Sequence, residues 1–169
     1  IPSDWLGLSD RVCVVTGGGG GIGRAVALSL AEAGARVAVV DRDERGLETA
    51  RAELAKLGGD HVVTTCDTSS LDSVTAASAI IERALGPCHV LANTAAVLRP
   101  GALDALSLAE WNTVLSINLT GYFICAQVFG KQMRAHRRGS LIHVSSIAGS
   151  HPQGQSGAYS VSKAGVISL

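Results

Sequence analysis

The chain has 169 residues, of which 47% are apolar, and its 14 basic and 14 acidic residues leave no formal net charge. This length suits one domain with a real core, and the apolar content excludes a disordered chain. The basic residues form no stripe beyond the run His136-Arg137-Arg138, so a nucleic-acid partner is not expected. No uninterrupted apolar run approaches the length of a membrane span, so no membrane partner is expected either.

The cysteines have no spacing typical of a metal site, which predicts that no metal ion is bound. Three of the four lie in or beside apolar runs, so we expect buried free thiols and, from them, a reducing cytoplasmic compartment. The first residue is Ile1 rather than Met, and no signal peptide is visible. The four cysteines are Cys13, Cys66, Cys88 and Cys125.

After a lead-in at residues 1–8, short apolar runs alternate with longer segments of helical character. The runs predict strands at residues 11–16, 36–40, 61–65, 88–93 and 140–145. Helices are predicted at residues 21–33, 43–57, 67–85, 107–137 (with a break near Asn112 or Asn118) and 157–169. This alternation predicts an α/β fold, a Rossmann-type doubly wound parallel sheet in a single domain over residues 1–169, with strand order 3-2-1-4-5. Ligands bind such sheets where the strand order reverses, here beside residues 16–23 and 93–96.

A glycine-rich turn joins the first strand to the first helix. Glycines allow positive φ angles and close approach of a ligand to the main chain, and the helix that follows points free N–H groups at the same place. A phosphate is therefore the expected ligand. A flexible glycine linker is the alternative interpretation, and it is disfavoured because a strand and a helix flank the glycines. A P-loop is unlikely because Arg24-Ala25 follows where Lys and Ser or Thr are needed. The dinucleotide pattern G-x-G-x-x-G fits Gly18, Gly20 and Gly23. The wider pattern T-G-x-x-x-G-x-G fits Gly17, Gly21 and Gly23, with Ile22 between the last two glycines.

Two acidic residues follow predicted strands. Asp41 closes the second strand, in the position of the carboxylate that holds a ribose hydroxyl in dinucleotide sites, and it favours NAD over NADP because it repels a 2′-phosphate. The neighbouring Arg42 works against that preference, and a plain turn residue is the alternative interpretation of Asp41. Asp67 follows the third strand, where contact with the adenine and capping of the next helix are equally favoured.

Tyr159 and Lys163 lie four residues apart at the start of the last predicted helix, so their side chains share a face. A phenol has a pKa near 10, and a neighbouring ammonium lowers it. Tyr159 could then exchange a proton with an alcohol or carbonyl oxygen. Taken alone, the pattern Y-x-x-x-K occurs by chance in many helices.

The joint pattern is far more specific. Across almost the whole chain, the order and spacing of these motifs resemble the short-chain dehydrogenase/reductase family with its NAD(P)-binding T-G-x-x-x-G-x-G turn. The motifs are the glycine turn, Asp41, Asn93-Thr94-Ala95-Ala96, Asn118, Ser145-Ser146 and Tyr159-x-x-x-Lys163.

The resemblance implies a role for each matching residue. Tyr159 would be the general acid/base, and Lys163 would hold the nicotinamide ribose and lower the tyrosine pKa. Ser146 would hydrogen-bond the substrate oxygen, with Ser145 only ending the strand. Asn118 would anchor a water in a proton relay, although a helix-kinking Asn with a main-chain contact is the alternative. The implied cofactor-binding set is Gly17, Gly21, Ile22, Gly23, Asp41, Asp67, Asn93, Tyr159 and Lys163.

The sequence departs from the family pattern in two places. Ala96 stands where the family usually has glycine, which we expect to shift the adenosine side slightly. The chain also ends six residues after Lys163, before the family's further strands and substrate loop, so we expect an incomplete record of a longer chain with an unpaired outer edge on strand five. Among the histidines, His143 is expected to pack in its strand, whereas His151 is either solvent-exposed or faces the substrate.

These observations favour an NAD-dependent oxidoreductase that interconverts a secondary alcohol and a ketone, with a small-molecule substrate. A 3-oxoacyl-thioester reductase that uses NADPH is the alternative within the same family. A nucleotide-binding or interaction module without turnover is the alternative from another class. The resemblance also implies a homodimer or homotetramer, with the 107–137 helix and the last helix at the interface.

Overall fold

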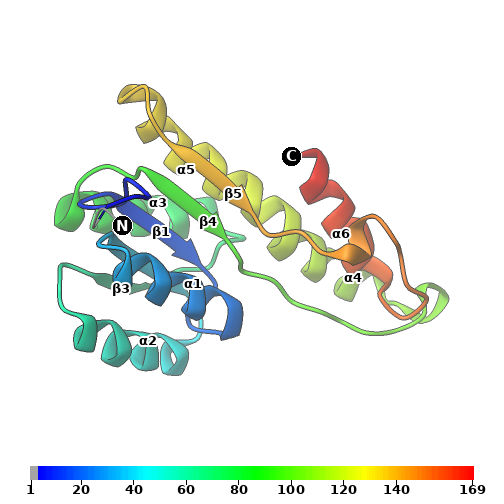
Figure 1. Ribbon diagram of the computed structural model, residues 1–169. Coiled ribbons are helices and arrows are strands. Elements are labelled where there is room, and N and C mark those ends of the chain that lie inside the picture. Colours follow the sequence, from blue (N-terminus) through cyan, green and yellow to red (C-terminus); the bar gives the residue numbers. More distant parts are fainter. Residues whose placement is uncertain (1–3) are drawn as a thin grey trace.

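The computed structural model describes residues 4–169 (Figure 1). Part of the predicted lead-in therefore lies outside the described residues. Within these residues, five parallel strands form one sheet in the order β3-β2-β1-β4-β5, which confirms the predicted order. The strands are β1 (Val12–Thr16), β2 (Arg36–Asp41), β3 (Val62–Thr65), β4 (Val90–Asn93) and β5 (Ser140–His143).

Helices connect these strands and cover both faces of the sheet. They are α1 (Gly21–Glu32), α2 (Glu44–Leu57), α3 (Leu71–Leu85), α4 (Leu108–Leu115), α5 (Gly121–Ala135) and α6 (Gly157–Ser168). The helix predicted over residues 107–137 is thus α4 and α5 joined by a π-helical segment, Ser116–Thr120. That segment contains Asn118, one of the two positions where a break was predicted.

Alternation along β1 divides the core into two layers. Val12 and Val14 face one side of the sheet, where α3 and α5 pack, and Cys13 and Val15 face the other, where α1 and α2 pack. All five residues of β1 are buried because the strand lies between β2 and β4 and is covered on both faces. The carboxyl end of β1, from which the glycine turn leaves, is therefore anchored in the best-packed part of the domain.

The outer strand β5 has one strand neighbour, β4, and an exposed surface, as predicted. Leu141 and Ile142 point to opposite faces and are 44% and 50% exposed. Helix α6 packs against α4 and the π-helical segment, and Figure 1 shows it beyond β5, away from the other strands.

All four cysteines are free and buried, which confirms the expectation from their spacing. Burial raises the pKa of the Cys13 thiol to about 11 and that of Cys88 to about 12. These thiols stay protonated at neutral pH and act as small apolar core residues.

One helical run bears on the expectation about membrane spans. The continuous helical run Leu108–Ala135 has 28 residues and is long and apolar enough to cross a membrane by length and composition alone. It combines three helical segments, so no single uninterrupted apolar run revealed it. Its buried side chains, such as Cys125 and Phe129, pack on the sheet as those of a core helix do.

Two histidines extend the strand ladder at the amino ends of the strands. The main-chain N–H of Val12 donates to Nδ1 of His89 at 3.2 Å, and that of Val37 donates to Nδ1 of His61 at 3.2 Å. Both bonds require an unprotonated Nδ1. Burial lowers the pKa of His89 from its ordinary value of 6.5.

We expect His89 to make the fold sensitive to acid. Because its pKa is lower in the folded than in the unfolded chain, its contribution to stability is full above pH 6.5 and is lost as the pH falls through the folded value. His89→Ala should lower the free energy of unfolding by about 1 kcal/mol at neutral pH and weaken its acid dependence. Urea unfolding between about pH 5 and pH 8 measures this. His151→Ala, at an exposed loop position, is the control, and identical acid profiles for both variants would contradict the assignment.

Candidate active site

The glycine turn packs tightly against the strand ends. Gly17 has φ +69°, and a Cβ on it would lie 2.6 Å from Cα of Ala95. A Cβ on Gly23 would lie 2.5 Å from Oγ1 of Thr94, whereas a Cβ on Gly21 would meet open space. The first and last glycines of the wider pattern are therefore required by packing, and the middle one leaves room for a ligand.

Helix α1 begins at the open part of this turn. Its N-cap, Gly20, supplies no side-chain acceptor, and the first turn of the helix contains no acidic residue. The N–H groups and the positive end of the helix dipole thus face the open side of the turn, and no side chain of the helix's own first turn competes for them. This arrangement suits a phosphate, as predicted from the sequence.

One buried hydroxyl ties the ends of β1 and β4 together. Oγ1 of Thr16 donates to Oδ1 of Asn93 at 3.3 Å and accepts from the main-chain N–H groups of Thr94 and Ala95 at 3.1 and 3.3 Å. Oγ1 of Thr94 in turn donates to the carbonyl of Thr16. These bonds hold the segment after β4 against the glycine turn, at the predicted reversal of strand order.

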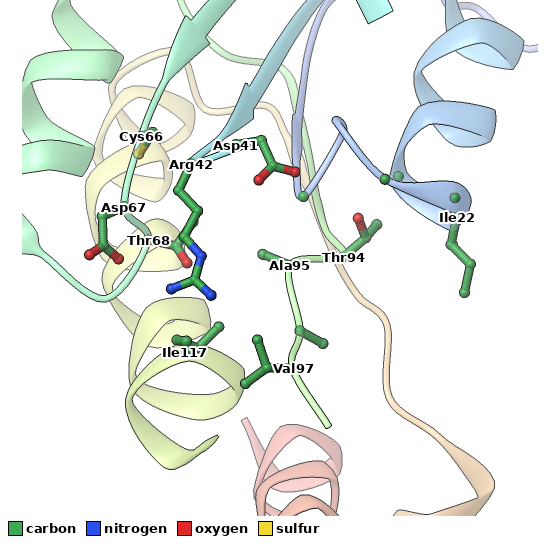
Figure 2. Close-up of a pocket in the computed structure, with 15 residues that line it drawn as sticks. Ile22, Asp41, Arg42, Cys66, Asp67, Thr68, Thr94, Ala95, Val97 and Ile117 are labelled. Carbon is green, nitrogen blue, oxygen red and sulfur yellow. The ribbon is translucent and has the colours of Figure 1, made fainter. Parts of the chain in front are cut away.

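A cavity of about 330 Å³ lies at this reversal (Figure 2). That volume is at the lower end of the range for small-molecule sites. Its wall contains Thr94, Ala95 and Ala96 after β4, as the switch-point argument predicted. It also contains six residues of the predicted cofactor set: Gly17, Gly21, Ile22, Gly23, Asp41 and Asp67.

Asp41 serves the turn and lines the cavity at once. Its Oδ2 accepts from the N–H of Gly19 at 3.0 Å, and its Oδ1 accepts from the N–H of Asp43 at 3.0 Å. The alternative interpretation as a turn residue is therefore correct, and it coexists with the position in the cavity wall. Figure 2 shows Asp41 directed toward the glycine turn, while the side chain of Arg42 extends across the cavity toward Ile117.

Asp67 does not cap the next helix, so the capping alternative is wrong. The cap of α3 is Ser70, whose hydroxyl accepts from the N–H of Ser73. The Asp67 carboxylate instead accepts from the hydroxyl of Ser69 at 2.6 Å and from its N–H at 2.9 Å. The bond from the Ser69 hydroxyl is the main cause that lowers the pKa of Asp67, so a negative charge stands in the cavity wall at neutral pH.

Asn93 lies behind the cavity rather than in its wall. It is fully buried, and its amide Nδ2 donates to the main-chain carbonyl of Tyr122 at 3.4 Å and contacts Nδ1 of His143 at 3.1 Å. Direct contact between the Asn93 side chain and a cofactor stays a prediction. What the structure adds is a supporting role, because Asn93 connects β1, α5 and β5.

Asn118 clamps the chain that leaves β4. Its Oδ1 accepts from the N–H of Val97 at 2.8 Å, and its Nδ2 donates to the Val97 carbonyl at 2.9 Å and to the Ser162 hydroxyl at 3.1 Å. The main-chain contact foreseen as the alternative is therefore present. Both amide hydrogens are used, so a relay water would need the remaining Oδ1 lone pair or a main-chain carbonyl.

Lys163 and Tyr159 lie close together on α6. Nζ of Lys163 is 5.8 Å from the ring centroid of Tyr159, and Lys163 is 1% exposed. The ammonium donates to the Val144 carbonyl at 2.7 Å and to the Tyr122 hydroxyl at 3.2 Å. Burial lowers the pKa of Lys163 to about 8, so the cation is only moderately favoured at neutral pH.

The two serines after β5 have different surroundings. Oγ of Ser145 donates to the Lys163 carbonyl at 2.8 Å, which fixes the strand end to α6, as its assignment as a strand-end residue implies. Oγ of Ser146 accepts from the N–H of Ala148 at 3.2 Å. Among the hydrogen bonds within residues 4–169, none joins Ser146 to Tyr159. His151 is exposed and contacts Ser150, and His143 packs on Tyr122, as expected for that strand residue.

Several residues of this region escaped the sequence analysis. Ile117 and Val97 line the cavity but are apolar and carry no chemical signature. Gly46, in the first turn of α2, is another: a Cβ there would lie 2.5 Å from the Gly19 carbonyl oxygen. Within residues 4–169, no group of three or more His, Cys, Asp or Glu could hold a metal ion.

We expect Gly46→Ala to displace the glycine turn and to weaken nucleotide binding. A Gly→Ala change inside a helix ordinarily stabilises a protein by about 0.5–1 kcal/mol, and the clash with Gly19 should cancel that gain. Gly130→Ala is the matched control, because Gly130 lies in α5 with open space around it. Titration calorimetry with NAD and urea unfolding of both variants measure the effect. Equal nucleotide affinities in the two variants would contradict it.

Known proteins similar to this chain identify its family. The family model for short chain dehydrogenase matches residues 11–169. D-threitol dehydrogenase of Mycolicibacterium smegmatis is 36% identical over 162 residues, which cover 96% of this chain and 62% of that protein. A 3-oxoacyl-[acyl-carrier-protein] reductase of Bos taurus is 37% identical over 158 residues, which cover 94% of this chain and 65% of that protein.

A crystal structure of NAD⁺-bound xylitol dehydrogenase superposes with a TM-score of 0.93 at 31% identity, covering 96% of this chain and 63% of that one. This chain thus spans less than two thirds of the length of these relatives. The match of the family model over nearly the whole chain, together with the shared fold, shows that the chain belongs to the short-chain dehydrogenase/reductase family of oxidoreductases.

Proposed function

We propose that the protein, at its full natural length, interconverts a secondary alcohol and a ketone with NAD(H) as cofactor. Two features together carry this proposal. The glycine turn presents free N–H groups to an anion, and a buried lysine lies next to the ring of Tyr159. The open space at Gly21 and the carboxylate of Asp41 in the cavity wall suit a dinucleotide with a free 2′-hydroxyl.

When bound, the nicotinamide supplies the hydride chemistry, and the residues of the chain supply position and a proton. Tyr159 takes the proton of the alcohol oxygen during oxidation and returns it to the carbonyl oxygen during reduction. The charge of Lys163 favours the phenolate form, Ser146 hydrogen-bonds the substrate oxygen, and Asn118 holds a relay water. These are the roles that the family resemblance implies for the four residues.

The wider setting is part of the same proposal. Exposed apolar side chains on α4, α5 and α6, among them Leu108, Phe123 and Ile167, support a homodimer or homotetramer that uses these helices. Four free buried thiols support a reducing cytoplasmic location. The balanced charge supports a small-molecule substrate rather than a nucleic-acid partner.

Reduction of a 3-oxoacyl thioester with NADPH is the second candidate. Arg42 favours it, because its guanidinium extends into the cavity and could meet a 2′-phosphate there. The similarity to a 3-oxoacyl-[acyl-carrier-protein] reductase supports it as well.

Tyr159→Phe should lower turnover by roughly 100-fold or more, because it removes the hydroxyl group that exchanges a proton with the substrate oxygen. NAD affinity should remain close to that of the unmodified protein. Initial rates with a panel of secondary alcohols and calorimetric NAD binding measure the two effects. Unchanged turnover would refute Tyr159 as the acid/base, and NAD binding without any turnover in the unmodified protein would favour a non-catalytic module.

The cofactor preference can be tested at two neighbouring positions. Asp41→Asn removes the negative charge that repels a 2′-phosphate, so the NAD-to-NADP affinity ratio should fall by roughly tenfold, about 1.4 kcal/mol. Arg42→Ala should leave NAD affinity nearly unchanged if NAD is the natural cofactor. A large loss of NADP affinity in Arg42→Ala, together with tighter NADP than NAD binding before mutation, would instead support the NADPH-dependent reductase.

A further inference from the structure

The ammonium of Lys163 is buried, and it has no acidic partner among residues 4–169. Its hydrogen bonds go to the Val144 carbonyl at 2.7 Å and to the Tyr122 hydroxyl at 3.2 Å. The ion pairs found within residues 4–169 join Arg24 to Glu53 and Arg51 to Glu48, so none of them involves Lys163. The stability of a buried cation that is held by neutral oxygen atoms depends strongly on where those atoms lie.

The Tyr122 hydroxyl is oriented so that it accepts from Lys163. It donates its own hydrogen to the Val144 carbonyl at 3.3 Å, which leaves its lone pairs for the ammonium. Tyr122 is fully buried, and its ring packs against that of His143 at a centroid distance of 5.7 Å. The hydroxyl therefore has one fixed position on α5.

The position of the ammonium follows from these contacts. Nζ lies 4.9 Å from the ring centroid of Tyr122 and 5.8 Å from that of Tyr159, so the cation stands between two phenol rings. An ammonium has three hydrogens, and Val144 and Tyr122 take two of them. One hydrogen remains for the reacting side of the site.

We propose that Tyr122 is a positioning residue for Lys163, whose ammonium it fixes between the two phenol rings so that the remaining hydrogen points to the cofactor and to Tyr159. The inference rests on the proposed roles of Lys163 and Tyr159. It goes beyond the residues that the family resemblance assigns, because Tyr122 is none of them, is fully buried and does not line the cavity.

Tyr122→Phe is the test, because it removes the hydroxyl and keeps the ring. The lost acceptor disfavours the charged form of Lys163, so the pKa of Lys163 should fall below its value of about 8. NMR titration of the lysine side chain in the cofactor-free protein measures this shift. Among the described residues, the titratable groups near the ammonium or Tyr122 are Tyr159 from α6, His143 from β5 and Cys125 from α5, and all three remain in the variant.

The kinetic readout separates positioning from mere structure. With the protein at its full natural length, kcat should fall roughly tenfold while KM for the alcohol stays nearly constant, and the limb of the pH profile due to Lys163 should move to lower pH. Ser145→Ala is the matched control, because it removes a different hydroxyl that bonds the main chain of Lys163 and leaves both partners of Nζ in place.

An unchanged Lys163 titration in Tyr122→Phe, or the same kcat and pH profile in Tyr122→Phe and Ser145→Ala, would overturn the proposal. Because the titration needs no turnover, its outcome is independent of the proposed reaction. If Tyr159→Phe leaves turnover intact, the proposed function is refuted. If Tyr122→Phe leaves the Lys163 titration unchanged, only this inference is refuted.

Discussion

The site depends on the buried hydroxyl of Thr16. It is the point at which β1 and β4, two parallel neighbours whose chains leave in opposite directions, are held together at their carboxyl ends. The segment after β4 then presses so closely on the turn that Gly17 cannot carry a side chain. The cavity lies directly beside this contact, since Gly17, Thr94 and Ala95 also line it. Its polar wall is therefore supported by the most deeply buried strand of the domain.

A second feature is that most polar side chains of this region already have partners within the chain. Asp41 holds the turn, Asp67 holds Ser69, Asn93 connects three elements and Asn118 clamps Val97. Such bonds fix the groups before a ligand arrives, which reduces the reorganisation needed on binding. The side chain of Arg42 is different, since it is exposed and extends across the cavity. A ligand in the cavity therefore meets a fixed carboxylate at Asp41 and an adaptable guanidinium at Arg42.

The sequence predicted the order of the strands, the glycine turn and a ligand site beside residues 93–96, of which 94–96 line the cavity, because these follow from periodicity, crossover rules and local backbone needs. It did not predict Gly46 or Tyr122. The requirement for glycine at position 46 comes from Gly19, which lies across the turn, and the role of Tyr122 comes from Lys163, which is 41 residues away. Contacts of this kind between distant segments leave no pattern in a single sequence.

The π-helical segment between α4 and α5 constrains the number of residues that can join these two helices. One wide turn at Ser116–Thr120 places Asn118 against Val97 while Cys125 and Phe129 still face the sheet. Each residue of an α-helix advances the rotation by about 100°. A relative with one residue fewer between α4 and α5 would have to give up either the Asn118 clamp or the packing of α5, so this stretch should tolerate exchange of side chains far better than a change in residue count.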